Sequence, residues 1–285
     1  MKYKDFVTSI LQETSGIARK SFGKVSWSLK DDYNQVLTET DEEIGEYIIQ
    51  KIQKNFPKHN IIDEEAGAIN NNSDFTWVID PIDGTSNFAF GVPSYGTMIG
   101  LLHKDIPIIG GLALPEFKEI YFAEKGKGAT CNGKRVKVTA ETDLSRSLIS
   151  YSIDANRENS HLTEKECQLA AKIILNVRSL RMSNSVFDTA MVITGKYGAY
   201  LMQHSKIWDN VAQEVLVKEA GGKYTDFFGK PINYKDAFSR LEENFTFCLA
   251  AAGLHTKLQK IIHSSVKEKS QAWLPKGKEK LQSHF

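Results

Sequence analysis

The sequence predicts a layered α/β protein with mixed, largely antiparallel sheets. Apolar runs separated by turn residues group in the middle of the chain, and segments with helical spacing precede and follow them. Helices and strands of this kind bury their apolar faces by packing in layers. The 285 residues are enough for one large domain or two closely packed subdomains.

The N-terminal segment predicts two helices. Apolar residues recur at helical spacing across residues 5–22, and a polar loop follows at 30–35. Thr40 or Asp41 can cap the second helix, because acidic residues then lie in its first turn. This helix should end before Pro57, since the residue that precedes a proline disfavours the helical conformation. The side chains expected to point inward are Ile44, Tyr47, Ile48 and Ile52.

Strands dominate the next part of the chain. Residues 61–67 predict a short strand that runs into a turn, and residues 75–80 predict a buried strand that stops at Pro81. A short helix is expected to open at 84–86. Three runs separated by turn residues predict neighbouring antiparallel strands at 97–102, 106–114 and 118–122.

Helices and strands alternate in the C-terminal part. Strands are expected at 148–153, 199–202 and 245–250, and helices at 162–175, 186–194, 207–220 and 254–262. The final residues change character and become rich in lysine. We therefore expect an N-terminal subdomain at 1–147, a C-terminal subdomain at 148–265 that completes a shared site, and a basic tail at 266–285.

The overall charge is balanced. Lys plus Arg is 36 and Asp plus Glu is 35, so the formal net charge is +1. This balance gives no electrostatic reason to expect nucleic acid or an anionic membrane as the main partner. The chain shows neither a signal peptide nor an apolar stretch long enough to span a bilayer. Three cysteines without a C-x-x-C pair are typical of reduced thiols, so we expect a cytoplasmic protein.

Two aspartates three residues apart mark the end of the strand at 75–80. Pro81 lies between them and restricts Asp80 to an extended backbone, and Gly84 permits a tight turn directly after Asp83. The helix start that follows exposes backbone N–H groups, which can hold a phosphate. One short segment therefore offers oxygen ligands for a hard cation and donors for an anion.

Glu64 and Asp209 are the natural additions to this pair. Glu64 follows the preceding strand, and Asp209 lies at the start of a predicted helix. Mg²⁺ prefers carboxylate and carbonyl oxygens, and several carboxylates suit two or more ions that support in-line phosphoryl displacement. Taken singly, each of these acidic residues also fits an ordinary helix cap, turn or solvated side chain.

Four segments resemble the motifs of the inositol monophosphatase family. The run W-V-I-D-P-I-D-G-T-S-N-F at 77–88 is similar to the whole of the family signature. The run W-D-N-V-A at 208–212, followed by E-A-G-G at 219–222, is similar to its C-terminal segment. Residues 63–67 and 36–41 resemble its E-E-x-G and V-T-x-x-D stretches. The four segments follow the family's order along most of the chain.

The resemblance implies a role for each matching residue. The implied metal ligands are Glu64, Asp80, Asp83, Asp209 and the backbone carbonyl of Ile82. Thr85 and Asp41 match the pair that orients and deprotonates the attacking water, and Glu64 is also assigned to catalysis. The residues expected to contact the substrate are Asp83, Gly84, Thr85, Ser185 and Asp209.

The resemblance also implies an architecture and an activity. The family fold is an alternating α/β/α/β/α sandwich, commonly a homodimer. The implied activity is that of a phosphoric monoester hydrolase, in which water activated by two or three Mg²⁺ ions attacks a small phosphorylated metabolite. Mn²⁺ is expected to substitute for Mg²⁺, and Ca²⁺ or Li⁺ to inhibit. The chemistry agrees, because cations must neutralise a doubly negative phosphate before hydroxide can approach it.

The alcohol side of the site departs from the family pattern. Met202 stands seven residues before Asp209, where inositol phosphatases place a glutamate that binds a ring hydroxyl. A thioether cannot accept a strong hydrogen bond from a hydroxyl. The run 183–188 and Gln213 depart from the pattern as well. The polar residues available to contact the alcohol are Arg181, Asn184, Ser185, Gln203, His204 and Lys206, although each taken singly also fits ordinary surface or structural polarity.

Several substrates and one other class of function therefore stay open. The candidates are an inositol phosphate, histidinol phosphate, a sugar phosphate or bisphosphate, and a 3′,5′-bisphosphate nucleotide. A bisphosphate predicts a second phosphate site, for which Arg181 and Lys206 are available. The other class is a regulatory or RNA-machinery-associated protein on the phosphatase scaffold, and only the lysine-rich tail favours it.

Overall fold

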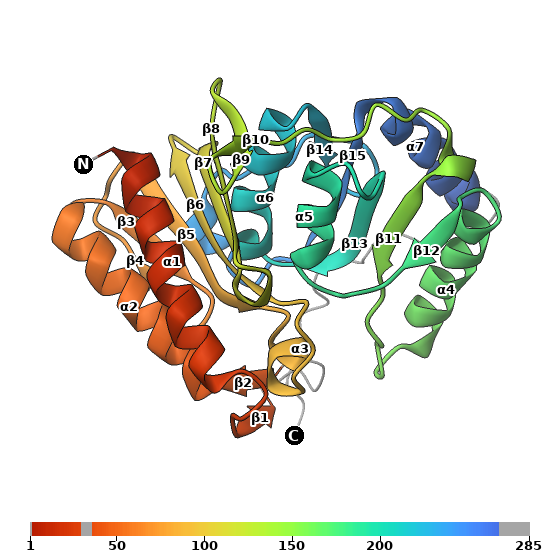
Figure 1. Cartoon of the computed structure of the whole chain (residues 1–285). Coiled ribbons are helices and arrows are strands. Elements are labelled where there is room, and N and C mark those ends of the chain that lie inside the picture. The colour runs from red at the N-terminus through yellow and green to blue at the C-terminus, as the bar shows by residue number, and fades with distance from the viewer. Residues whose placement is uncertain (1, 30–35, 268–285) are drawn as a thin grey trace, which may run out of the picture.

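The chain folds into five alternating layers (Figure 1). The computed structural model describes residues 2–29 and 36–267, so the predicted loop at 30–35 and residues 268–285 of the predicted tail lie outside the described residues. Two sheets are separated by a central helical layer and covered by helices on their outer faces. This arrangement confirms the predicted α/β/α/β/α sandwich.

The larger sheet has eight strands, and β3 and β5 form its one parallel pair. It packs against α1 (Tyr3–Ser21) and α2 (Glu39–Asn55) on its outer face. Its strands, in spatial order, are β10 (Lys134–Arg135), β9 (Gly128–Cys131), β8 (Glu119–Glu124), β7 (Ile106–Leu114), β6 (Gly96–His103), β5 (Phe75–Asp83), β3 (Asn60–Asp63) and β4 (Gly67–Ile69).

The smaller sheet has five strands and is mixed. Its strands, in spatial order, are β12 (Ser179–Arg181), β11 (Leu148–Ser152), β13 (Ala199–Ser205), β15 (Phe245–Ala251) and β14 (Gly222–Thr225). Strand β11 is parallel to both neighbours, and the other pairs are antiparallel. Helices α4 (Ser160–Ile174) and α7 (Ala252–Lys267) cover its outer face. The prediction of mixed, largely antiparallel sheets is confirmed.

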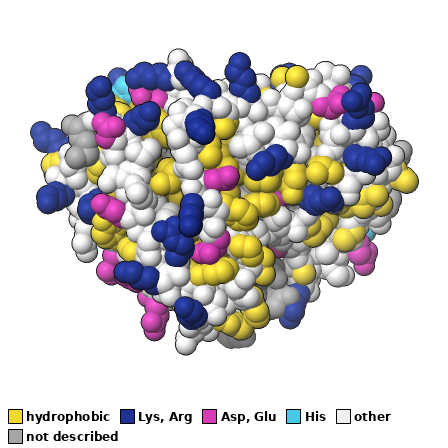
Figure 2. Space-filling view, in the orientation of Figure 1, with side chains coloured by type: hydrophobic (Ala, Val, Ile, Leu, Met, Phe, Trp, Pro, Cys, Tyr) yellow, Lys and Arg dark blue, Asp and Glu magenta, His cyan; other side chains and the backbone are white. Residues whose placement is uncertain are grey.

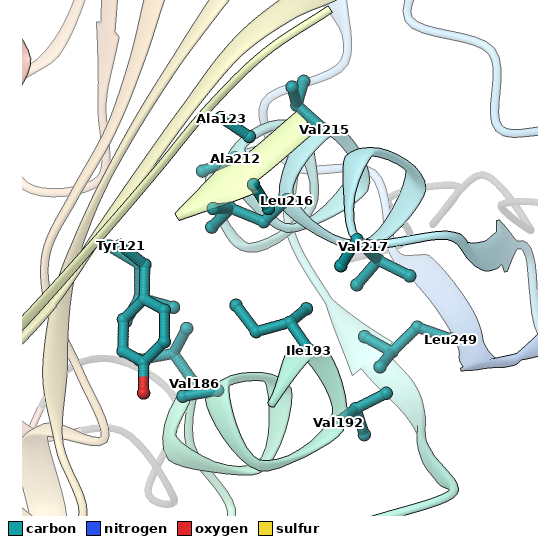
Figure 3. Packing of buried hydrophobic residues seen from close by; sticks show 14 of the residues in the cluster. Tyr121, Ala123, Val186, Val192, Ile193, Ala212, Val215, Leu216, Val217 and Leu249 are labelled. Atoms are coloured by element: carbon teal, nitrogen blue, oxygen red, sulfur yellow. The ribbon is translucent and has the colours of Figure 1, made fainter. Parts of the chain in front are cut away.

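Helices α5 (Phe187–Ile193) and α6 (Ile207–Glu219) form the central layer. Figure 3 shows their apolar side chains, among them Ile193 and Leu216, packed between Tyr121 of β8 and Leu249 of β15. Glycines in the larger sheet let α6 approach closely, because a Cβ atom on Gly100 would lie 2.6 Å from Val211 Cγ1. The start of α6 is thereby held against β6 and its neighbour β5, which carries the signature motif.

The remaining elements are short. Strands β1 (Trp27–Leu29) and β2 (Val36–Thr38) pair with each other, and α3 (Thr85–Ala89) follows β5. Single 3₁₀ turns occupy Pro115–Phe117, Leu144–Arg146 and Ala237–Ser239. None of the helices within residues 2–29 and 36–267 is long and apolar enough to cross a membrane. The division of the chain into subdomains at residues 147 and 148 stays a prediction.

Two local predictions were wrong. Helix α2 begins at Glu39 with Thr38 as its N-cap, so neither Thr40 nor Asp41 caps it. Asp41 instead occupies the third helical position, where its carboxylate accepts a hydrogen bond from the backbone N–H of Thr38. Tyr47 is only half-buried, because its hydroxyl bonds to Glu13 at the surface.

Strand β5 also does not stop at Pro81 as predicted. It continues to Asp83 through an irregularity, where pairing with β6 shifts between Asp80 and Asp83. The ladder tolerates Pro81 because a bulge needs no N–H at that position. The hydroxyl of Thr97 donates to the Pro81 carbonyl at 2.8 Å and holds the bulge in place.

Candidate active site

Three predicted carboxylates converge at the end of β5. The side chains of Asp80, Asp83 and Asp209 each place an oxygen within 4.8 Å of the other two. Asp80 and Asp83 flank the bulge of β5, whereas Asp209 lies in the first turn of α6 and accepts a hydrogen bond from Lys206 N at 2.5 Å. Asp80 is buried, and the other two are partly exposed. Packing of α6 on the sheet therefore joins two segments that lie far apart in the sequence.

Glu64 belongs to the same site. It follows β3, and its backbone N–H donates to the Ile79 carbonyl of the neighbouring strand at 3.2 Å. Its side chain lines the cavity that Asp80, Asp83 and Asp209 also line. We call Glu64, Asp80, Asp83 and Asp209 the carboxylate cluster.

Burial and mutual repulsion make these charges costly. The pKa of Asp83 is raised well above its usual value, first by burial and then by the charge of Asp209. Burial and the charge of Glu64 raise the pKa of Asp209 to about 7. A divalent cation relieves both effects, because it favours the charged carboxylates and supplies the missing positive charge. An all-oxygen donor set of this kind fits Mg²⁺.

Gly84 forms a tight turn between the cluster and α3. Its φ is +83°, which a residue with a side chain rarely adopts, and an added Cβ would lie 2.8 Å from Ser185 Cβ. Gly84 is the N-cap of α3, and it lines the cavity together with the first residues of this short helix. The backbone N–H groups at the helix start, which have no partner within the helix, therefore lie beside the cavity. The Ile82 carbonyl, which also lines the cavity, accepts a hydrogen bond from Thr85 Oγ1 at 2.8 Å.

Asp41 and Thr85 lie side by side. Oδ2 of Asp41 accepts from Thr38 N at 2.9 Å, and Oδ1 lies 3.3 Å from the hydroxyl oxygen of Thr85. The Asp41 side chain is buried, and this burial raises its pKa to about 7, with smaller contributions from the charges of Glu65 and Glu64. A carboxyl group that ionises near neutral pH and holds a hydroxyl suits proton transfer.

The carboxylate cluster opens into a cavity of about 1170 Å³. Four of the polar residues available to contact the alcohol line it, namely Asn184, Ser185, His204 and Lys206, and so does Met202. The other two do not. Arg181 donates to Ser179 Oγ at 2.7 Å, and Gln203 bonds to the Tyr151 hydroxyl on the opposite face of β13. Neither residue is among those that line the cavity, so both fit the ordinary structural polarity that the sequence also allowed.

Sequence reasoning missed a loop of the cavity. Residues 154–158, between β11 and α4, line it, as do Tyr200 and Asn244. The loop is polar and joins a strand to a helix, which is a signal that the sequence does contain. We call this loop, together with Met202, His204 and Lys206, the β13 wall.

The fold and the carboxylate cluster together are typical of the phosphatases that use metal ions. The chain belongs to the inositol monophosphatase family, because the model of the family described as "Inositol monophosphatase family" matches residues 3–271. Members of this family hydrolyse phosphoric monoesters and generally depend on a metal, so the chain is a phosphoric monoester hydrolase.

Individual relatives agree with this assignment. An inositol monophosphatase 1 of Solanum lycopersicum is 34% identical over 216 residues, which cover 74% of this chain and 79% of that protein. A fructose-1,6-bisphosphatase/inositol-1-monophosphatase of Thermotoga maritima is 30% identical over 93% of this chain and 97% of its own. A solved IMPase structure from Thermotoga maritima superposes with a TM-score of 0.82 at 28% identity, over 94% of this chain and 99% of that one.

Proposed function

We propose that the chain hydrolyses a small phosphate monoester in a Mg²⁺-dependent reaction at the carboxylate cluster. The observation that carries the proposal is the convergence of three carboxylates within 4.8 Å beside the Gly84 turn. Glu64, Asp80, Asp83, Asp209 and the Ile82 carbonyl would hold two or three Mg²⁺ ions. Mn²⁺ would substitute for Mg²⁺, whereas Ca²⁺ or Li⁺ would inhibit.

The proposed mechanism assigns binding and proton transfer to the chain's own residues. Bound Mg²⁺ would neutralise the phosphate and make water more acidic. The backbone at Gly84 and Thr85 would hold the phosphoryl oxygens, with Ser185 close to that turn. Thr85 would orient the attacking water and pass its proton to Asp41, whose pKa of about 7 suits this role. Glu64, as a further carboxylate of the cluster, would assist the activation of water.

The leaving alcohol would then lie against the β13 wall. Met202 lines the cavity at the position where inositol phosphatases place a glutamate, so the wall has lost an acceptor for a ring hydroxyl. The candidate substrates remain an inositol phosphate, histidinol phosphate, a sugar phosphate or bisphosphate, and a 3′,5′-bisphosphate nucleotide. Relatives named for both fructose-1,6-bisphosphate and inositol 1-phosphate support a pocket that can differ in its alcohol.

Phosphate release from a panel of these esters, with and without Mg²⁺, tests the proposal. Asp83→Asn should abolish Mg²⁺-dependent release, because it removes one charge from the centre of the cluster. Asp74→Asn is the matched control, since Asp74 is exposed and pairs with Lys104 away from the cavity. Release that is independent of Mg²⁺, or equal in both variants, would contradict the proposed site.

A regulatory role is the second candidate. A relative named Nus factor SuhB, from Pasteurella multocida, is 32% identical over 69% of this chain and 73% of its own length. On the face shown in Figure 2, basic and acidic side chains are interspersed, and a single-sign patch of the kind that binds nucleic acid does not stand out. Deletion of residues 266–285 separates the two roles, because it should weaken partner capture but not turnover if the tail serves a partner.

We also propose a homodimer in the cytoplasm. Support for the dimer comes from the edge strand β12, near which Ile174, Leu175 and Met182 expose apolar side chains, Leu175 by 86%. Support for the compartment comes from Cys131, Cys167 and Cys248, which are free thiols. Light scattering of the purified chain tests the dimer, and Leu175→Asp should shift a dimer towards the monomer.

A further inference from the structure

A short turn joins the carboxylate cluster to the β13 wall. It consists of residues 183–186, which lead from β12 into α5, and we call it the α5 turn. Asn184 and Ser185 of this turn line the active-site cavity. Two segments that lie far from it in the sequence contact it, namely the signature segment after β5 and the loop at 154–158. The α5 turn therefore connects the two parts of the site through direct hydrogen bonds.

The signature segment makes two hydrogen bonds with the α5 turn. The backbone N–H of Val186 donates to Asp83 Oδ1. The side chain of Asn87, in α3, donates through Nδ2 to the Ser183 carbonyl at 2.8 Å. The first bond bears on the cluster itself, because a ligand carboxylate that a neighbouring donor holds keeps one orientation towards a cation. The position of the Val186 N–H, and hence the shape of the turn, therefore affects how Asp83 is presented.

Asn184 links the α5 turn to the β13 wall. Its Nδ2 donates to Asp154 Oδ1 at 3.0 Å and lies 3.5 Å from the Ile153 carbonyl oxygen. Both acceptors follow the end of β11. The φ of Asn184 is +50°, in the left-handed region that asparagine adopts more readily than most residues with a side chain. The hydrogen bond to Asp154 thus holds the residue at which the turn changes direction.

Backbone shape alone does not explain an asparagine at this position. A glycine would adopt the same φ without strain. The Oδ1 of Asn184 is buried and has no hydrogen-bond partner among residues 2–29 and 36–267, which is costly for a polar atom. The contact that the side chain does make is the one to Asp154 and the end of β11. This contact is therefore the reason that the structure offers for the amide.

We propose that Asn184 is a positioning residue for the metal site. Bonded to Asp154, it holds the α5 turn in the conformation that presents the Val186 N–H to Asp83. The inference rests on the proposed Mg²⁺-dependent function and adds a residue outside the carboxylate cluster on which cation binding depends. Asn184 would act through Asp83 without touching the cation, so the loop at 154–158 would influence the metal site from the alcohol side of the cavity.

Binding of Mg²⁺ alone, measured by titration calorimetry without substrate, tests the inference. Asn184→Gly keeps the left-handed backbone and removes the amide, whereas Asp154→Ala removes its acceptor. We expect each variant to weaken Mg²⁺ binding about tenfold, since loss of a group that orients a metal ligand has an effect of about this size. The double variant should bind Mg²⁺ little more weakly than either single variant, because both substitutions break the same hydrogen bond.

Two further variants separate orientation from charge and from folding. Asp154→Asn removes the charge but keeps an oxygen that can accept from Asn184, so it should bind Mg²⁺ nearly as tightly as the unaltered chain. Asn132→Gly is the matched control. Asn132 has a φ of +46°, and its side chain makes two hydrogen bonds to the backbone outside the cavity. Its replacement should leave the Mg²⁺ affinity unchanged.

The outcomes distinguish failure of this inference from failure of the proposed function. A chain that binds no Mg²⁺ refutes both. A chain that binds Mg²⁺, while Asn184→Gly and Asp154→Ala bind it as tightly as Asn132→Gly does, refutes the inference alone. Additive losses in the double variant would refute it too. So would an equal loss in Asp154→Ala and Asp154→Asn, because the charge of Asp154, and not its bond to Asn184, would then favour the cation.

Discussion

The carboxylate cluster and the β13 wall face the same cavity but are built differently. The cluster uses a short, motif-rich segment at the end of β5 and one helix start, and its geometry follows from a bulge and a glycine turn. The β13 wall uses a strand end, a loop and a pair between Glu166 and His204 that no local motif announces. The contrast predicts that reaction chemistry and substrate choice are encoded separately, so that different substitutions change each of them.

Apart from the loss of a metal ligand, the single substitution with the largest expected effect on activity is at Asp41. Asp41→Asn should lower kcat by about 10² to 10⁴ with little change in KM, because the water loses its proton acceptor. In the unaltered chain, kcat should rise with pH through an inflection at or below about pH 7, since the pKa of Asp41 is about 7 and bound cations lower it. The variant should lose this inflection.

Thr38→Ala controls for the structural role of Asp41. It removes the N-cap contact to Asp41 while the carboxylate stays beside Thr85. We expect it to lower the free energy of unfolding by about 1 kcal/mol and to keep the inflection in the pH profile of kcat. A loss of the inflection in Thr38→Ala as well would mean that Asp41 acts only as part of the helix cap.

A substitution on the β13 wall should have the next largest effect, and this effect is on the choice between substrates. Met202→Glu restores a carboxylate acceptor beside His204, so kcat/KM should rise about tenfold for inositol 1-phosphate and fall about tenfold for fructose 1,6-bisphosphate. Steady-state kinetics on both substrates measure the change. Met182→Glu, at an exposed methionine outside the cavity, is the matched control. Equal changes in both variants would show that the cavity charge does not select the alcohol.

Cation binding should change how stability depends on pH. The folded-state pKa values of Asp41 and Asp209 are raised to about 7 from 3.8, so the folded protein binds protons more tightly than the unfolded chain. Without metal, the stability that this provides is present below about pH 4 and is lost as pH rises through 7. Excess Mg²⁺ should therefore raise Tm more at pH 8 than at pH 5. We expect the two rises to differ by about 5 °C.

The unfolding temperature, measured against pH with chelator and with Mg²⁺, tests this linkage. Asp83→Asn should reduce the Mg²⁺-induced rise at pH 8, whereas Asp74→Asn should not. A rise of the same size at both pH values would mean that the ions bind away from the carboxylate cluster.

The last prediction concerns Asp188, which lies near both the carboxylate cluster and the β13 wall, and its effect is on stability alone. It lies in the first turn of α5 and is fully buried, and this burial raises its pKa to about 6. The stability linked to its proton is present below about pH 4 and is lost as pH rises through 6. Asp188→Asn should therefore raise the free energy of unfolding by about 1 to 2 kcal/mol at pH 8 and change it little at pH 4. Denaturant unfolding at the two pH values decides the question.

The long elements could be predicted from the sequence, but the short ones could not. Segments such as α1, β7 and α6 show their period over many residues, and the layered architecture follows from their order. Strands β9 and β14 have only four residues each, which is too few for an alternating pattern to stand out. They are strands because neighbouring strands supply their hydrogen bonds.

The capping of α2 was misjudged although the signal was present. Thr38 and Asp41 stand three apart, which is the spacing of a reciprocal cap, and this spacing favours Thr38 as the N-cap over Thr40 or Asp41. The error matters for the site, because the cap holds one oxygen of Asp41 and leaves the other near Thr85. The predicted roles of these residues in catalysis stay predictions until the variants are measured.

The sequence by itself determined the chemical content of the site. Asp80, Pro81, Asp83 and Gly84 are neighbours in the chain, so their type and spacing already predict a cation site beside an anion-holding turn. Only the tertiary structure decided what stands around that segment. Asp209 joins it because α6 packs between the two sheets, and His204 meets Glu166 because β13 extends past β11. Contacts between distant segments depend on how layers pack and where strands end, and no local pattern of residues records either.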